Sequence, residues 1–472
     1  MEARTAALTA MGAYCLLMLA IGAWAATRTR DQEDFFLGGR RLGPTLAALS
    51  QGATQSSAWT LVGVSGAAYA WGLSAVWIWL SVVAGYAVNW GWVAPRLRRL
   101  SRQQGSLTLV QLLAGSENNA PALWLRRSAS LVIVCSFLFY AAAQFQAAGS
   151  AFAVTLDLDL RACILAGALL IIAYTLVGGF WAATVSDGVQ ACLMLVVAIA
   201  LPIAGLLAVG GPVAMLGLLD SAGSQQADWL GGRAGVAAVA FVVGTLGIGL
   251  AAPGQPHVVN HFMAARDEQA IRRGGVIALV WIAAILAGML VVGWCARVLT
   301  VPDPESVIYL GAAAWLPPVV GGIVAVAVMS AIMSTADSQI VTATSSLTVD
   351  LKGASAPAAG APRLFATRLA LVGFGLAAVA VALFAPASIY SRVLFAWNAL
   401  GAAFGPLVLL AVAGRPCRPV AALAGLWTGF LLTVILYLAP NAEGDVLERV
   451  LPFVVALGVS LLTDRRERAH RA

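Results

Sequence analysis

The sequence predicts an all-α integral membrane protein with thirteen transmembrane helices. Of its 472 residues, 61% are hydrophobic and 10% are charged, a balance that is typical of chains folded in lipid rather than in water. A helix needs about 20 apolar residues to cross the hydrocarbon core of a bilayer. Apolar segments of that length follow one another along almost the whole chain, and the uneven placement of the cationic residues supports the same count.

Each predicted span is an apolar segment that ends at a short polar or arginine-rich joint. In chain order, the thirteen spans cover residues 5–26, 44–69, 72–95, 128–155, 161–181, 187–210, 234–256, 274–298, 317–350, 364–385, 389–413, 418–439 and 446–463. We interpret the first of them as a retained helix rather than a signal peptide, because no small-residue cleavage site lies between it and Arg28.

The cationic residues predict the orientation, because loops that stay in the cytoplasm are enriched in Lys and Arg. With the N-terminus outside and thirteen crossings, only six of the 28 Lys and Arg residues fall in outside loops, and the other 22 fall inside. One span more or fewer would scramble this division. We therefore expect a multi-pass protein of the inner (plasma) membrane with its C-terminus in the cytoplasm.

Charge and cysteine usage exclude other classes. The net charge of +7 is explained by the orientation signal, and a soluble basic face with base-stacking aromatic residues, which nucleic-acid binding would need, is absent. The six cysteines are scattered without a CxxC pair, so neither a disulfide framework nor a metal centre of that kind is expected. The bilayer is an expected partner, and no nucleic acid is expected.

The second span contains the first of two predicted breaks in a helix. Six polar side chains lie between Ser50 and Ser57, after an apolar start at Pro44. Polar clusters at this depth are costly in lipid unless they are buried in protein or line a wet cavity. Although Gly and Pro are common in membrane helices anyway, this cluster predicts a broken helix around Ala53 to Ser57.

The seventh span contains the second predicted break, around Gly249 to Pro256, and three glycines and two prolines lie close together between Gly247 and Pro256. The two breaks are five helices apart, and inverted-repeat transporters place a broken helix at the start of each repeat, with solute and ion between them. We therefore expect a transport core over residues 44–413 with repeats at 44–210 and 234–413. Residues 1–43 add an N-terminal helix and cytoplasmic loop, and residues 414–472 add two helices and a short cytoplasmic tail.

The ninth span offers a polar surface to the first break. Ser334 and Ser338 share one helical face with Ala331 and Thr335 beside them. Such oxygens suit a small hard cation, but small and hydroxyl residues also let helices pack closely, and spacing alone does not separate these readings. Asp337, an acid inside an apolar segment, favours function. Asp187, at the start of the sixth span, is by position better explained as a helix N-cap.

Several motifs, in order, resemble the sodium/solute symporter family from about residue 30 to residue 440. They are residues 35–44 (FFLGGRRLGP), 178–180 (GGF), 187–190 (DGVQ), 254–257 (GQPH), 262–265 (FMAA), 333–335 (MST) and 401–406 (GAAFGP). The resemblance implies a LeuT-type fold of five-plus-five inverted repeats with one helix before the core and two after it. That arrangement agrees with the thirteen spans.

The resemblance also implies a sodium site. Its ligands would be the backbone carbonyls of Ala53, Ser56 and Ala331 and the hydroxyls of Ser334 and Thr335. Some members bind a second cation nearer the cytoplasm, and the matching residues here are Asp187, Asp337 and Ser338. Two neighbouring carboxylates could tighten sodium binding or hold a proton, because one acid raises the pKa of the other.

The solute is less closely specified by the resemblance. Members that carry proline have an acid where this chain has Gln55, and pocket aromatics where it has Ile248 and Ala252. The pocket should therefore have a different shape. The candidate solute contacts are Gln55, Ser57, Trp59, Tyr140, Gln144, Ile248, Ala252, Gln255 and Asn398.

The sequence is therefore expected to encode a secondary active symporter that imports a small organic solute with sodium by alternating access. The expected solute is an amino acid of the proline class, the coupling ion is Na⁺, and no other cofactor is expected. The alternatives are a small monocarboxylate or other polar solute, and coupling to protons instead of sodium. An enzyme is not expected, because His257, His261 and His470 supply neither a nucleophile with its base nor a metal cluster.

Overall fold

The computed structural model describes residues 2–29, 32–115, 119–156, 158–351, 361–384, 389–439 and 445–469. Within these ranges the regular elements are helices, apart from an isolated parallel bridge between Leu42 and Ala265. The first half contains α1 (Glu2–Ala26), α2 (Gln32–Leu37), η1 (Gly38–Arg40), α3 (Pro44–Gln55), η2 (Trp59–Gly63), α4 (Val64–Trp71), η3 (Gly72–Ala75), α5 (Val76–Val88), η4 (Asn89–Val93), α6 (Ala94–Gln104), α7 (Leu109–Ala114), α8 (Ala120–Leu156), α9 (Leu160–Val209) and α10 (Pro212–Ser221).

The second half contains α11 (Gly235–Leu250), η5 (Ala252–Gly254), α12 (Pro256–Ala264), α13 (Glu268–Cys295), η6 (Ala296–Val298), η7 (Pro304–Ser306), α14 (Val307–Trp315), α15 (Pro318–Ser345), η8 (Ser346–Asp350), α16 (Ala361–Phe384), α17 (Ile389–Val412), α18 (Pro419–Leu438), α19 (Val446–Arg449) and α20 (Leu451–Ala469). The all-α prediction is confirmed for the part of the chain that the structure describes.

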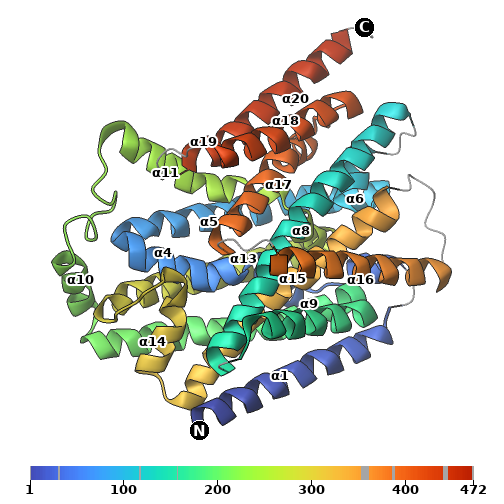
Figure 1. The fold of residues 1–472 in the computed structure, drawn as a ribbon. Helices are drawn as coiled ribbons and strands as arrows, with labels where there is room; N and C mark the ends of the chain where they lie inside the picture. Colours follow the sequence, from blue (N-terminus) through green and yellow to red (C-terminus); the bar gives the residue numbers. More distant parts are fainter. Residues whose placement is uncertain are drawn as a thin grey trace.

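Eleven helical segments in the described ranges are long and apolar enough to cross a bilayer. One of them, Trp59–Gln104, reverses direction near Gly72, so that α4 and α5 form the two arms of a turn in Figure 1, and both pack against α13. A shorter apolar helix, Leu160–Leu176, forms the start of α9. Each of the thirteen predicted segments thus falls on helix, while thirteen crossings and their orientation stay predictions.

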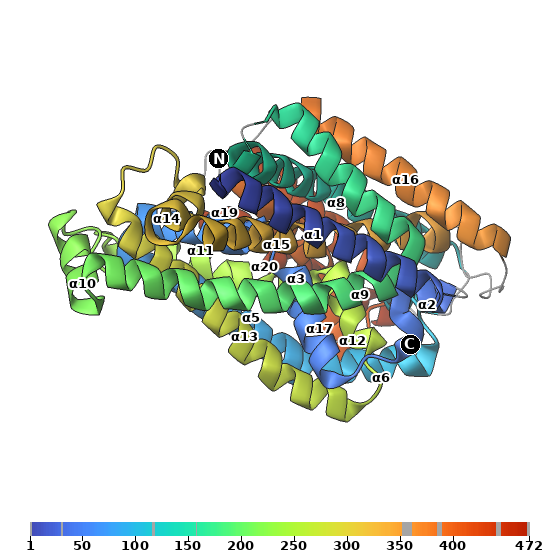
Figure 2. The same cartoon turned by 90° about the horizontal axis from the view of Figure 1, so that it is seen from below.

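The joint predicted between the fifth and sixth spans is instead one helically bonded element, α9. Its bend is at Gly179, which has φ 56° and ψ −143° and would bring a Cβ to 2.6 Å from the ring of Phe35. Positive φ and this close approach both require glycine. Figure 2 shows the two arms, residues 160–178 and 180–209, meeting near α2.

Both predicted breaks are present. After α3 the backbone leaves the helical region at Ser56 (φ −98°, ψ 80°) and resumes as a π-turn at Trp59. After α11 it passes through a 3₁₀ turn and an extended residue, Gln255 (φ −89°, ψ 105°), before Pro256 starts α12. Proline suits that first helical position because it has no N–H to leave unpaired.

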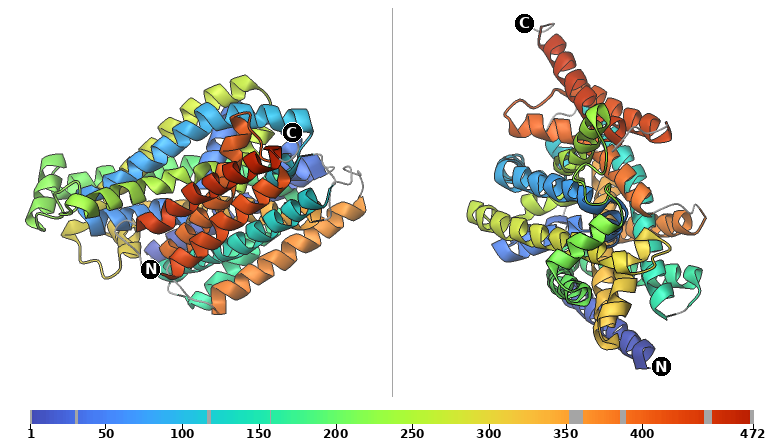
Figure 3. Two further views of the ribbon diagram at one scale, coloured as in Figure 1. Left: turned by 90° about the horizontal axis from the view of Figure 1, so that it is seen from above. Right: turned by 90° about the vertical axis from the view of Figure 1, so that its left-hand side faces the viewer.

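The two breaks lie inside a bundle rather than at its surface. The longest described helices, α8, α9 and α15, pack against one another, and α3 packs on α9, α13 and α15. The final helices α18 and α20 pack on each other and on α17. Figure 3 shows α1 and α20 on opposite edges of this core. The break at the end of α3 is therefore surrounded by the long helices of the core.

Arg40 holds three segments together at the end of the bundle where α3 begins. Its guanidinium donates to Ser101 Oγ at 2.8 Å, to the Ser106 carbonyl at 2.6 Å and to the Met263 carbonyl at 3.3 Å, and it pairs with Glu33 at 2.9 Å. The side chain is only 7% exposed. One buried cation therefore joins α2, α12 and the end of α6 with the turn after it.

Candidate functional site

The end of α3 is joined to α15 by two hydroxyl groups. Ser334 Oγ donates to the Ala53 carbonyl at 3.0 Å, and Thr335 Oγ1 donates to the Thr54 carbonyl at 3.0 Å. Both hydroxyls also lie 3.1 Å from the Ala331 carbonyl of their own helix. The Ala53 carbonyl also accepts the Ser56 N–H at 2.9 Å, and because a carbonyl oxygen has two lone pairs it can accept both hydrogen bonds.

The five predicted sodium ligands therefore lie at one junction of two helices. Ala53, Ser56, Ala331, Ser334 and Thr335 are all fully buried. Ser56 follows Ala53 by three residues, at the point where the helix opens, and its Oγ has no hydrogen-bond partner among the described residues. A buried group of neutral oxygens, some with lone pairs unused, suits a small hard cation.

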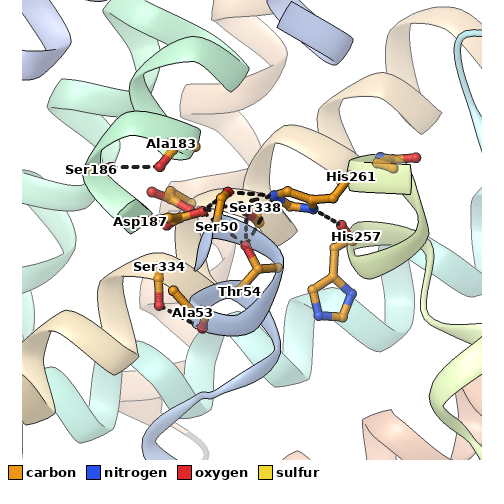
Figure 4. Close-up of polar contacts among 12 residues, drawn as sticks. Ser50, Ala53, Thr54, Ala183, Ser186, Asp187, His257, His261, Ser334 and Ser338 are labelled. Carbon is orange, nitrogen blue, oxygen red and sulfur yellow. Dashed lines mark hydrogen bonds and ion pairs between the residues drawn. The ribbon is translucent and has the colours of Figure 1, made fainter. Parts of the chain in front are cut away.

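A second polar cluster lies beside this junction (Figure 4). Asp187 Oδ2 accepts hydrogen bonds from Ser50 Oγ at 2.7 Å and from Thr54 Oγ1 at 3.1 Å. Thr54 Oγ1 lies 3.0 Å from Ser338 Oγ. Thr54 therefore connects the carboxylate of α9 to the hydroxyl of α15.

Asp337, the other predicted acid, is buried one residue before Ser338. Its Oδ2 accepts a hydrogen bond from Tyr174 Oη at 2.6 Å. The Oδ1 atoms of Asp337 and Asp187 are both buried without a hydrogen-bond partner among the described residues. A buried carboxylate oxygen without a partner is costly unless a cation or a proton neutralises it.

The N-cap interpretation of Asp187 is wrong. Asp187 lies inside the second arm of α9, eight residues after the bend at Gly179, and its carboxylate points to α3 instead of to the backbone of its own helix. The interpretation failed because the second arm of α9 begins directly after Gly179, whereas the predicted sixth span begins at Asp187. The acid is therefore placed by tertiary contacts.

His261 was not predicted at this site. Its Nε2 lies 2.8 Å from Ser50 Oγ and 4.0 Å from Asp187 Oδ2, and its Nδ1 lies 3.1 Å from the His257 carbonyl. Figure 4 shows it reaching the cluster from α12, the helix that follows the second break. His257 itself packs edge-on against Phe137, at 5.1 Å between ring centroids.

A cavity of about 30 Å³ lies next to the first break. Its lining contains five of the predicted solute contacts together with seven further residues. The predicted ones are Gln55, Ser57, Trp59, Tyr140 and Ile248, and the others are Thr60, Val82, Tyr86, Ile282, Val393, Leu394 and Trp397. Among the further residues, Tyr86 was detectable from the sequence only as a residue of an apolar span.

The other four predicted contacts do not line this cavity. Gln144 Oε1 accepts the Ala58 N–H at 3.4 Å, and Gln255 Nε2 donates to the Trp397 carbonyl at 2.8 Å. Asn398 Nδ2 donates to Glu448 at 3.0 Å, and Ala252 is buried in the second break. Of these four, Gln144 and Gln255 therefore bond the backbone of neighbouring segments.

The cavity is small for a solute. A water molecule needs about 10–15 Å³ by this measure, whereas ligand pockets usually measure about 300 Å³ or more. Trp397 Nε1 donates to the Ile248 carbonyl at 2.9 Å and so closes the cavity between α11 and α17. A solute can enter only if these helices separate.

Comparisons with known proteins agree with this architecture. The model of the sodium:solute symporter family matches residues 35–429. The high-affinity proline transporter PutP of Bacillus subtilis is 31% identical over 465 residues, which cover 96% of this chain and 97% of that protein. The sodium/proline symporter of Escherichia coli is 32% identical over 435 residues, which cover 89% and 86%.

Two solved structures share the fold. The substrate-bound, outward-open state of a Na⁺-coupled sialic acid symporter has a TM-score of 0.80 at 16% identity, over 97% of this chain and 98% of that one. A nucleobase-cation-symport-1 transporter, MHP1, in a closed conformation has a TM-score of 0.58 at 11% identity, over 91% and 92%. At these identities the likeness concerns the fold alone.

Proposed function

The chain belongs to the sodium:solute symporter family and imports a solute with sodium across the plasma membrane, and from this premise we propose where ion and solute bind. The coupling ion binds at the junction of α3 and α15. The solute, proline or an amino acid of similar size, binds in the adjacent cavity. The single observation that carries the proposal is the pair of hydrogen bonds from Ser334 and Thr335 to the opened end of α3.

The sodium site would use the carbonyls of Ala53, Ser56 and Ala331 and the hydroxyls of Ser334 and Thr335. Each of these two hydroxyls donates to a carbonyl of α3. When an ion enters, the two hydroxyls rotate their protons away and turn lone pairs toward it, so that five oxygens replace its hydration shell. The ion thereby takes over the link between the two helices.

The second cation site would use Asp187, Asp337 and Ser338. Thr54 connects the Asp187 carboxylate to Ser338, the residue that follows Asp337, and a cation held by both buried carboxylates would offset the cost of burying their charges. Proton coupling is the rival here, and His261 close to Asp187 is the observation that favours it. Uptake driven by a pH jump without sodium would support the rival, and absence of such uptake would support sodium.

Two features favour a proline-sized solute in the cavity. Both relatives named above are proline transporters, and the cavity walls are largely apolar, with aromatic rings from Trp59, Tyr140 and Trp397. The helix that restarts after Ser57 directs the positive end of its dipole toward the cavity, which suits a carboxylate. Ile248 stands where proline-carrying members have an aromatic residue, so the fit differs from theirs.

The overall arrangement proposed is the LeuT type: repeats at 44–210 and 234–413, one helix before them and two after, thirteen crossings, and an outside N-terminus. The two breaks, each at the first helix of its proposed repeat, support it. Alternating access then needs only that the ion binds one state of the α3–α15 junction better than the other.

The test is uptake of radiolabelled L-proline into proteoliposomes with an inward sodium gradient. Sodium-dependent accumulation is expected, and collapse of the gradient should abolish it. A panel of unlabelled amino acids and monocarboxylates as competitors identifies the solute class. Competition by a monocarboxylate but not by proline would overturn the solute assignment and leave the ion site standing.

A further inference from the structure

A groove of about 500 Å³ opens on the outside of the bundle between the α5–α6 segment and α13, away from the site described above. Its lining contains three arginines, one glutamate, Trp90 and small or aliphatic side chains. The residues are Ala87, Trp90, Gly91, Pro95, Arg96, Arg99, Glu268, Ile271, Arg272, Gly275, Val276 and Leu279. Transport by the junction of α3 and α15 uses none of them.

Both walls of the groove change from charged to apolar in the same direction. Along α13 the charged residues Glu268 and Arg272 come first, and Gly275 to Leu279 follow. Along the other wall Arg99 and Arg96 give way to Gly91 and Ala87 as the chain is followed backward. Arg99 pairs with Glu268 at 2.9 Å and so aligns the charged ends of the two walls. The eleven residue steps of helix from Glu268 to Leu279 span about 16 Å, which is roughly half the thickness of the hydrocarbon core of a bilayer.

The charged end is electropositive. Arg99 and Glu268 neutralise each other, which leaves the charges of Arg96 and Arg272, both exposed, at the rim. Arg96 is held in place over Trp92, with its guanidinium 5.5 Å from the ring centroid and Nη1 donating to the Trp92 carbonyl at 3.1 Å. A tryptophan under an arginine is typical of the level of lipid headgroups.

The apolar end continues into a surface that faces lipid. Val276 and Val280, one turn apart on α13, are 65% and 67% exposed. Gly91 is exposed on the opposite wall, and a Cβ built there meets nothing within 4 Å. The groove thus has room for an acyl chain below a site for an anion.

We propose that this groove binds an anionic phospholipid of the cytoplasmic leaflet, with its phosphate between Arg96 and Arg272 and an acyl chain along Gly91, Gly275 and Val276. The placement in the cytoplasmic leaflet rests on the proposed orientation. Basic pockets between helices on that side of a membrane attract anionic headgroups, at about 1 kcal/mol for each arginine near the surface. Because both walls have a charged end and an apolar end side by side, the groove fits a lipid, which has a charged headgroup and an apolar chain, better than a soluble phosphate.

The experiment is native mass spectrometry of the full-length protein with phosphatidylglycerol and phosphatidylcholine of identical acyl chains. Wild type should retain phosphatidylglycerol preferentially. The double variant Arg96→Gln with Arg272→Gln should lower its occupancy on the order of tenfold or more. Arg273→Gln is the matched control, because Arg273 is an exposed neighbour on the same helix that does not line the groove.

Gly91→Leu is an independent variant that fills the groove without removing charge and meets open space on its own helix. It should displace both lipids. Equal retention of both lipids by wild type, unchanged binding in the double variant and in Gly91→Leu, or full competition by glycerol 3-phosphate would each overturn the proposal. Loss of a dimer in Gly91→Leu with lipid binding intact would assign the groove to a second protein copy instead. Sodium-driven uptake in detergent-free vesicles reports separately on the transport site.

Discussion

The hydroxyl of Ser334 donates a hydrogen bond to the carbonyl of Ala53 at 3.0 Å, across 281 positions of sequence. It joins the intact helix α15 to the opened end of α3, and Thr335 makes the same link to Thr54. Because these oxygens belong to the proposed ion site, binding of the ion and contact between the two helices are one event.

Ser334→Ala and Thr335→Ala should each raise the sodium concentration for half-maximal uptake by on the order of tenfold, because each removes one ion ligand. Sodium dependence of solute uptake in proteoliposomes is the measurement. Ser345→Ala is the matched control, since Ser345 is buried in the same helix and its hydroxyl bonds only the Thr342 carbonyl of that helix. Unchanged sodium affinity in both variants would show that the ion binds elsewhere.

Asp187→Asn should lower the Hill coefficient for sodium if the pair of acids binds a second ion. The amide still accepts hydrogen bonds from Ser50 and Thr54, so the helix contacts are kept while the charge is lost. The Hill coefficient of sodium-activated uptake should fall toward one. A wild-type coefficient of one, or a coefficient that the substitution leaves unchanged, contradicts the second site.

Ile248→Trp should abolish solute binding while leaving sodium binding in place, because it fills a cavity of about 30 Å³ that does not contain the ion ligands. Thermal stabilisation of the purified protein by proline and by sodium separates the two effects. Val239→Trp on the same helix is the control, since Val239 is 63% exposed and faces outward. Solute-induced stabilisation that survives in Ile248→Trp would move the solute site away from this cavity.

Arg40→Ala should destabilise the fold by roughly 2 kcal/mol, because it removes charge-assisted hydrogen bonds to three separate segments. The midpoint of chemical unfolding, followed by tryptophan fluorescence, is the measurement. Arg41→Ala should have little effect, since the Arg41 side chain is 57% exposed and makes one ion pair with Asp34. Equal effects of the two substitutions would show that burial of Arg40 contributes nothing.

Gly249→Ala should destabilise the packing of α11 on α5. A Cβ at position 249 would lie 2.1 Å from the Ser81 carbonyl oxygen, so the two helices must separate at a cost of about 1–3 kcal/mol. Gly373→Ala in α16 is the control, because a Cβ there meets nothing within 4 Å. A wild-type unfolding midpoint in Gly249→Ala would show that the close approach is not needed.

Composition and periodicity were sufficient for the all-α fold and for the places of both breaks. A membrane helix satisfies its backbone internally, so the polar cluster from Ser50 to Ser57 and the glycines and prolines from Gly249 to Pro256 show directly where that rule is broken. The family followed from short motifs in a fixed order. Each of these signals lies within a short stretch of sequence, so it can be recognised without knowing what packs against that stretch.

Which oxygens converge was decided only by the tertiary structure. Asp187 looked like a cap and instead reaches α3, and His261 was not predicted at the site but contacts Ser50. Gln255 and Asn398 bond the Trp397 carbonyl and Glu448 and do not line the cavity. The reason is physical: Asp187, His261 and Asn398 lie on helices and Gln255 lies in the second break, and the sequence does not say how far each helix is rotated or which way the break is directed. Rotation is set by the close packing of neighbours such as α9, α13 and α15, which involves residues hundreds of positions apart.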